Sequence, residues 1–133
     1  MLKRVPVVAL CVAIFCSCAR QLPLDLPADT PVQVLEASGS SNYTLDPSSE
    51  GYRTLARWIS DNRSGWSWFH YYTKPPSRGF IVRCGTLELR FFDSTVLDRT
   101  PQGDYLKTVQ PFEYEFLRRG ARDAKQSLQR PDG

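Results

Sequence analysis

The chain has 133 residues, enough for one domain and too few for two ordinary ones. Its 41% hydrophobic and 23% charged residues are typical of a folded globular domain and exclude an intrinsically disordered chain. The formal charge is +3, but without Lys3 and Arg4 there are 15 basic residues against 14 acidic ones, a charge of +1. A nearly neutral domain lacks the basic surface that nucleic acids require, so we expect no nucleic-acid partner.

Residues 1–20 have the layout of a secretory signal. Lys3 and Arg4 precede an apolar run from Val5 to Phe15. That run is shorter than the roughly 20 apolar residues that a transmembrane helix needs. Small residues and a cysteine follow directly, at Ser17-Cys18.

The run Phe15-Cys16-Ser17-Cys18 resembles the lipobox of bacterial lipoproteins, in which an aliphatic residue, a small residue and Gly, Ala or Ser precede a cysteine. Ser17 and Cys18 match the motif, whereas Phe15 and Cys16 depart from it. The resemblance implies that residues 1–17 are removed as a signal peptide and that Cys18 is lipidated with acyl chains such as palmitate. In enteric lipoproteins an Asp after the cysteine favours inner-membrane retention, so Ala19 implies an outer-membrane protein facing the periplasm.

Two alternatives stay open for this segment. Ser17-Cys18-Ala19 also fits the small-x-small site of ordinary signal peptidase, which would cleave after Ala19 and release a soluble secreted protein. An uncut segment would instead act as a membrane anchor. If the signal is removed and Cys18 is acylated, Cys84 is the one cysteine left, and we expect it to be a buried apolar side chain.

Residues 18–31 contain three prolines and no evident apolar periodicity, so we expect an extended tether between membrane and domain. A single domain is expected over residues 32–120, followed by a polar, disordered tail over 121–133. The domain should open with a weak edge strand near 32–37 and a short extended piece at 42–45.

A main helix is predicted over about 47–62. Asp46 is a natural N-cap, Pro47 suits the first helical position, and Gly65 provides a stop. Apolar residues recur at helical spacing, at Tyr52, Leu55, Ala56 and Ile59.

Strands are predicted after this helix. The aromatic stretch 66–73 should form a hairpin with 80–84, placing Tyr72 opposite Phe80, and further strands are expected at 87–91, 95–100 and 105–109. A short C-terminal helix should cover about 111–119 and end at Gly120. The predicted fold class is therefore α+β: a small antiparallel meander of four to five strands packed against one main helix.

No catalytic constellation is visible. His70 is the single histidine, which excludes a multi-histidine metal site, and we expect neither a metal nor a small-molecule cofactor. No histidine-activated nucleophile is apparent for Cys84. The carboxylates are expected to be scattered at turns and on outward faces: Glu88, Asp93, Asp98, Asp104, Glu113 and Glu115. We therefore expect no enzyme.

The aromatic residues suggest a binding face. Phe69, Tyr71 and Phe92 are predicted opposite the core face of the sheet, where aromatic side chains commonly form interfaces. The leading hypothesis is a membrane-anchored envelope lipoprotein that acts as a non-enzymatic binding or assembly partner of an envelope protein.

The alternative function is a periplasmic inhibitor or immunity protein directed against a cell-wall hydrolase. The stretch from Val82 to Phe91 is loosely similar to the cysteine-bearing strand region of membrane-bound lysozyme inhibitors. The partner cysteine and the Ser/Gly-rich inhibitory loop of that family are missing, so no site residue carries over.

Overall fold

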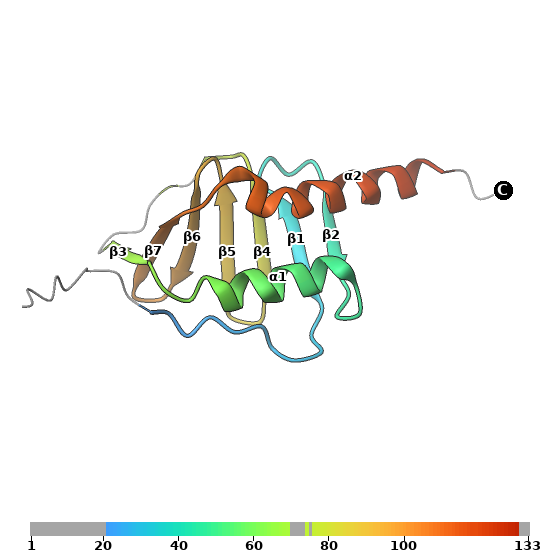
Figure 1. Ribbon diagram of the computed structural model, residues 1–133. Coiled ribbons are helices and arrows are strands. Elements are labelled where there is room, and N and C mark those ends of the chain that lie inside the picture. The colour runs from blue at the N-terminus through green and yellow to red at the C-terminus, as the bar shows by residue number, and fades with distance from the viewer. Residues whose placement is uncertain (1–20, 70–73, 75, 131–133) are drawn as a thin grey trace, which may run out of the picture.

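The computed structural model describes residues 21–69, 74 and 76–130. Within them, one antiparallel sheet carries two α-helices on a single face (Figure 1). The strands are β1 (Val32–Glu36), β2 (Asn42–Leu45), β3 (Ser67–Phe69), β4 (Phe80–Cys84), β5 (Leu87–Phe92), β6 (Thr95–Thr100) and β7 (Gly103–Thr108). The helices are α1 (Glu50–Asp61), a 3-10 turn η1 (Pro111–Tyr114) and α2 (Glu115–Gln129).

The predicted fold class is wrong, because the sheet has seven strands in the order β2-β1-β4-β5-β6-β7-β3 and is covered by two helices. A meander of four to five strands on one main helix would leave out β1 and β2. These strands instead extend the sheet, since Val34 pairs with Val82 of β4 on one side and with Tyr43 of β2 on the other. β1 is thus an interior strand, and β2 forms the edge where β1 was expected.

The predicted hairpin between the aromatic stretch and β4 is also wrong. β3 pairs with β7 at the far edge of the sheet, with Trp68 opposite Tyr105, while β4 pairs with β1 and β5. Tyr72, the expected partner of Phe80, lies outside the described residues; Phe80 is opposite Phe91. β3 therefore forms one edge of the sheet and does not supply its central hairpin.

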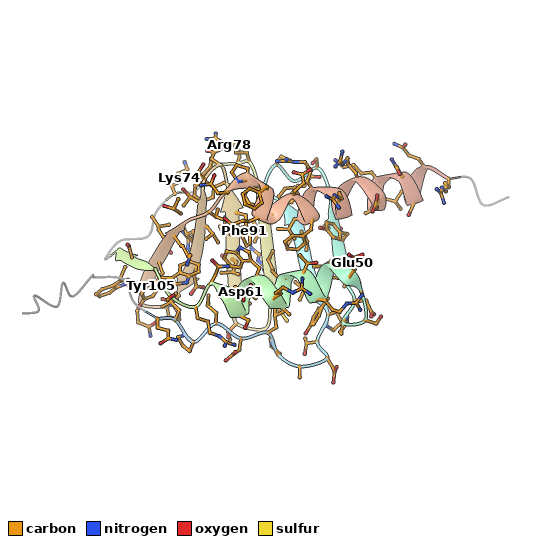
Figure 2. The ribbon with its side chains drawn as sticks, in the orientation of Figure 1. Glu50, Asp61, Lys74, Arg78, Phe91 and Tyr105 are labelled. Atoms are coloured by element: carbon orange, nitrogen blue, oxygen red, sulfur yellow. The ribbon has the colours of Figure 1, made fainter. Side chains whose placement is uncertain are left out.

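The core lies between the sheet and the helices. We call the covered side the helix face and the other side the helix-free face. Phe91 of β5 is 1% exposed and is seen between α1 and α2 in Figure 2. Its ring meets Trp58 of α1 at 5.0 Å and Tyr114 of η1 at 5.4 Å between centroids. Trp66 is fully buried and packs edge-on against Trp58 at 6.5 Å.

Helix α1 begins three residues later than predicted. Ser49 is its N-cap and accepts a hydrogen bond from the Tyr52 backbone N–H at 3.2 Å. Asp46 instead closes the turn before the helix, because its carboxylate accepts from the Ser48 backbone N–H at 2.9 Å. The buried residues of α1 are Leu55, Trp58 and Ile59, so the apolar spacing correctly indicated which side packs on the sheet.

Helix α2 is much longer than the predicted 111–119 and continues through the expected disordered tail to Gln129. Gly120 does not end it. A Cβ at Gly120 would lie 2.5 Å from the Tyr43 hydroxyl, which donates a hydrogen bond to the Leu117 carbonyl at 2.7 Å. The absence of a side chain at Gly120 therefore allows Tyr43 of β2 to approach α2 closely. The helix continues past Gly120 because the residues that follow have high helix propensity.

Residues 21–31, which we call the N-terminal strap, are not a free tether. Leu22 is 6% exposed and Leu24 is 4% exposed, and both belong to the core. The Leu22 backbone N–H donates to the Arg63 carbonyl at 2.7 Å, and the Arg63 guanidinium donates to the Leu24 carbonyl at 3.2 Å. The strap is thus fixed to the segment that follows α1 (Figure 1).

Candidate functional site

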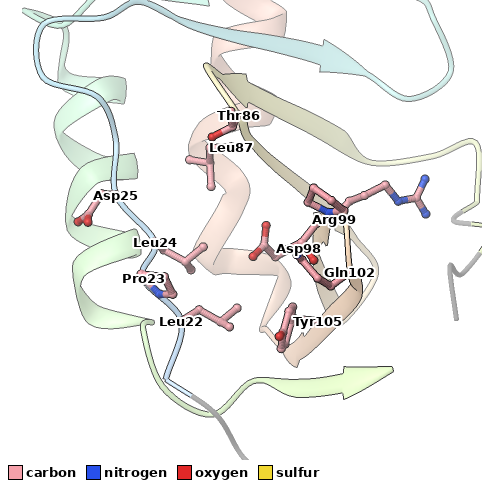
Figure 3. Close-up of a pocket in the computed structure, with 12 residues that line it drawn as sticks. Leu22, Pro23, Leu24, Asp25, Thr86, Leu87, Asp98, Arg99, Gln102 and Tyr105 are labelled. Atoms are coloured by element: carbon pink, nitrogen blue, oxygen red, sulfur yellow. The ribbon is translucent and has the colours of Figure 1, made fainter. Parts of the chain in front are cut away.

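The candidate site is a pocket of about 340 Å³ on the helix face, at the end of the sheet that the helices leave uncovered (Figure 3). The strap forms one wall, with Leu22, Pro23 and Leu24. The opposite wall comes from the start of β5 and from the β6–β7 hairpin. The pocket therefore exists only because the strap is folded onto the sheet.

Asp98 of β6 is the buried ionisable side chain in the lining of this pocket. It is 6% exposed, and Figure 3 shows its carboxylate directed toward the leucines of the strap. Its register partners are Leu89 on β5 and Tyr105 on β7, so its place in the sheet is flanked by a fully buried leucine and an aromatic ring. Within the described part of the chain, nothing donates a hydrogen bond to the Asp98 carboxylate.

Burial raises the pKa of Asp98 to about 6, and the negative charge of Asp104 adds to this effect. Desolvation penalises the ionised carboxylate, and a like charge nearby penalises it further. Asp104 belongs to the helix-free face, where it is fully buried and accepts from Arg99 at 3.1 and 3.2 Å. Arg99 is therefore directed away from the pocket and does not neutralise Asp98 (Figure 3).

Replacing Asp98 by Asn should stabilise the protein at neutral pH. Because the folded state holds the proton more tightly than the unfolded chain, the stability that Asp98 contributes is present below about pH 4 and is lost as the pH rises to about 6. We expect the variant to exceed the wild type in free energy of unfolding by about 2 kcal/mol at pH 7.5 and to match it near pH 4. Urea denaturation at both pH values measures this difference.

The control for this experiment is Asp123→Asn, which removes an exposed carboxylate on α2. Its effect should be small and nearly independent of pH between these values. An Asp98→Asn variant less stable than the wild type at pH 7.5 would contradict the raised pKa, because it would mean that the folded state stabilises the ionised carboxylate.

The described lining of the pocket holds one buried carboxylate, that of Asp98. Asp98 has no second titrating group in hydrogen-bond contact, so no acid–base pair is assembled among the described residues. Asp25 lines the rim, but its carboxylate pairs with Arg63 at 2.8 Å. No group of three or more potential metal ligands occurs in the part of the chain that the structure describes.

Two of the predicted binding-face residues, Phe69 and Phe92, lie on strands that are not neighbours in the sheet. Phe92 is half-buried at the end of β5, on the helix-free face. Phe69 ends β3, where its backbone is opposite Asp104 of β7. β6 and β7 separate these two strands, a distance of roughly 14 Å at about 4.8 Å per strand. Tyr71 lies outside the described residues, as does Cys18, so the binding face and the lipidation site stay predictions.

Cys84, the one cysteine among the described residues, has a structural role. Cys84 is 3% exposed, and its thiol is near the Thr30 and Pro31 carbonyls at 3.9 and 3.8 Å. Burial raises its pKa, which is the opposite of what an activated thiolate needs. The expectation of a buried side chain is confirmed. His70, the single histidine of the sequence, lies outside the described residues.

The prediction that the carboxylates lie at turns and on outward faces is wrong for two of them. Asp98 and Asp104 are buried, and Glu113 accepts from the Trp58 indole N–H at 3.2 Å. The residues of the lysozyme-inhibitor resemblance form the β4–β5 hairpin in the interior of the sheet.

Sequence reasoning missed Asp98, although its signal was present. Val96 and Asp98 are two residues apart in β6 and must share a face, and Val96 is a core residue. When a charged residue and an apolar residue share one face of a strand, either that part of the face is exposed to solvent or the charged residue is buried, often for a functional reason. Asp98 is buried because the strap covers this end of the sheet, and the strap could not be predicted from β6 alone.

Among the described residues, no helix has the length and apolar character needed to cross a bilayer. Comparison with protein-family models, with curated proteins and with solved structures gave no match.

Proposed function

We propose that the protein is a membrane-anchored envelope lipoprotein, acylated at Cys18, whose domain acts as a non-enzymatic binding or assembly partner on the periplasmic side of the outer membrane. The signal-like residues 1–17 and the lipobox resemblance at Phe15–Cys18 support the anchor. Two or three acyl chains on one cysteine would give stable anchoring, where a single chain would be marginal.

The observation that carries this proposal is the position of the strap. The chain enters the core at Leu22, only four residues after Cys18. Four extended residues span at most about 14 Å, so an acylated Cys18 would hold the domain directly at the membrane surface. This short connection favours a domain that binds a partner at the membrane surface over one that extends across the periplasm to reach it.

Metabolic labelling with an alkyne analogue of palmitate tests the anchor. We expect the wild type to be labelled and to sediment with membranes, and Cys18→Ala to lose the label and the sedimentation. The matched control is Cys16→Ala, which changes the neighbouring cysteine and should keep both.

An unlabelled wild type in the soluble fraction would contradict the proposal. Intact mass then distinguishes the alternatives, because cleavage by ordinary signal peptidase after Ala19 gives a chain that begins at Arg20, whereas an uncut anchor keeps the full mass.

The helix-free face supports the binding role. No helix of the described chain packs on it, and it carries a charged cluster in which Glu88 pairs with Arg83 at 2.8 Å and with Arg90 at 3.3 Å. Burial acts to raise the pKa of Glu88, but the two arginines outweigh it and hold that pKa below its usual value. Phe92 lies on the same face, beside Arg90 on β5. Aromatic and arginine side chains are the residues enriched in protein interfaces.

A photo-crosslinking amino acid at position 92 tests this role in intact cells. We expect a discrete adduct with an envelope protein from position 92 and none from position 60, because Ser60 is exposed on α1, on the opposite side of the sheet. Immunoblotting for the protein after ultraviolet irradiation reports the adduct. Equal adducts from both positions, or none from either, would contradict a partner on the helix-free face.

A further inference from the structure

We propose that the pocket over Asp98 binds a small organic cation, a primary ammonium group attached to an apolar body about the size of an aromatic ring. This inference is independent of the acylation of Cys18. It rests on a cavity of about 340 Å³ and on an aspartate, more than nine-tenths buried, whose carboxylate points into that cavity without a hydrogen-bond donor among the described residues.

An unpaired carboxylate in this position is unfavourable for the fold. Its register partner Leu89 and its strand neighbour Val96 are fully buried, and an apolar residue in place of Asp98 would extend the same core layer. Burying an ionised group without a partner is costly, and such groups are commonly found where a ligand supplies the missing partner. A primary ammonium group supplies both the charge and up to three donors.

The walls of the pocket determine the rest of the ligand. Leu22 and Leu24 face Asp98 across the cavity, and Leu87 adds a third aliphatic side chain. Tyr105 lies directly opposite Asp98 in the register, so a cation held at the carboxylate is near an aromatic ring as well. The volume is at the lower end of the range for small-molecule sites. The ligand is thus an amine with a compact apolar group.

Other ligand classes fit less well. An anion would be repelled by Asp98, and the guanidinium of Arg99, the arginine in the lining, is held on the helix-free face by Asp104. A divalent metal ion needs several oxygen ligands, whereas the second acidic side chain of the lining, Asp25, is paired with Arg63. A quaternary ammonium carries no N–H to donate to the carboxylate, and such ligands need several aromatic walls.

The test uses benzylammonium, with benzyl alcohol as the neutral analogue of the same shape and benzyltrimethylammonium as the cation without donors. Titrations of the isotope-labelled full-length chain are followed by 15N–1H correlation spectra. We expect saturable shifts at the amides of residues 98–105, with a benzylammonium dissociation constant on the order of millimolar. Both analogues should bind about tenfold more weakly or worse, because a charge-assisted hydrogen bond is lost.

Variants assign the effect to the carboxylate. Asp98→Asn should weaken benzylammonium binding about tenfold or more and leave benzyl alcohol binding unchanged, while Asp123→Asn, an exposed charge removal on α2, should change neither. The wild-type comparison of the three probes stands even if the variant fails to fold. Equal binding of amine and alcohol, undiminished amine binding by Asp98→Asn, or no saturable shift at residues 98–105 would each overturn the proposal.

Discussion

Phe91→Ala should lower the free energy of unfolding by about 3–5 kcal/mol. Phe91 is 1% exposed and contacts the rings of Trp58 in α1 and of Tyr114 in η1, the turn that leads into α2. Truncation removes the apolar area of the ring and leaves a cavity that neither helix can fill without moving away from the sheet. Because domains are typically stable by only 5–15 kcal/mol, much of the stability would be lost. Urea denaturation followed by far-ultraviolet circular dichroism measures the change.

Phe112→Ala is the matched control, since it makes the same substitution at a side chain that is 78% exposed. We expect a change within about 0.5 kcal/mol. If the two variants were destabilised equally, Phe91 would not be the element that joins the helices to the sheet, and the two-layer arrangement would be wrong.

The local sequence pattern was sufficient to predict α1 and β5. The apolar spacing at Leu55 and Ile59 placed α1 on the sheet, and the alternation of Leu89 with Arg90 and Phe91 placed β5. The start of α1 was less certain, because Asp46 and Ser49 are both good capping residues and only the turn geometry determines which one caps the helix.

Strand partners could not be predicted, because they depend on contacts distant in sequence. Trp68 pairs with Tyr105, and no local signal relates two residues so far apart. Loop length suggested instead that the aromatic stretch would pair with the next strand. The length of α2 was missed for a different reason: residues after Ala121 present no buried apolar stripe, so periodicity gives no helix signal there although propensity does.

The sequence does not reveal the strap, because its prolines are also typical of an extended tether. Leu22, Leu24 and Leu26 do alternate in the sequence, and the structure buries the first two and half-buries the third. Pro23 does not interrupt this packing, since the strap is not a strand of the sheet and needs no ladder hydrogen bond from that residue. The candidate pocket was missed as a consequence, because the strap forms one of its walls.

Leu24→Ala should therefore lower the free energy of unfolding by about 2–5 kcal/mol, whereas a free tether predicts no change at all. Leu24 is 4% exposed and belongs to the core. The Arg63 guanidinium donates a hydrogen bond to the Leu24 carbonyl at 3.2 Å. The loss combines the apolar area removed from the core with the cavity left between strap and sheet. Chemical denaturation of the full-length chain gives the magnitude.

Leu128→Ala supplies the comparison, since it truncates the same side chain at a position that is 87% exposed on α2. Its cost should stay within about 0.5 kcal/mol. If both substitutions cost equally little, the strap would not be part of the core, and the pocket over Asp98 would lose a wall. If Leu24→Ala alone is costly, the core extends to within six residues of Cys18, a span of at most about 20 Å, and an anchor at that cysteine would keep the domain close to its membrane.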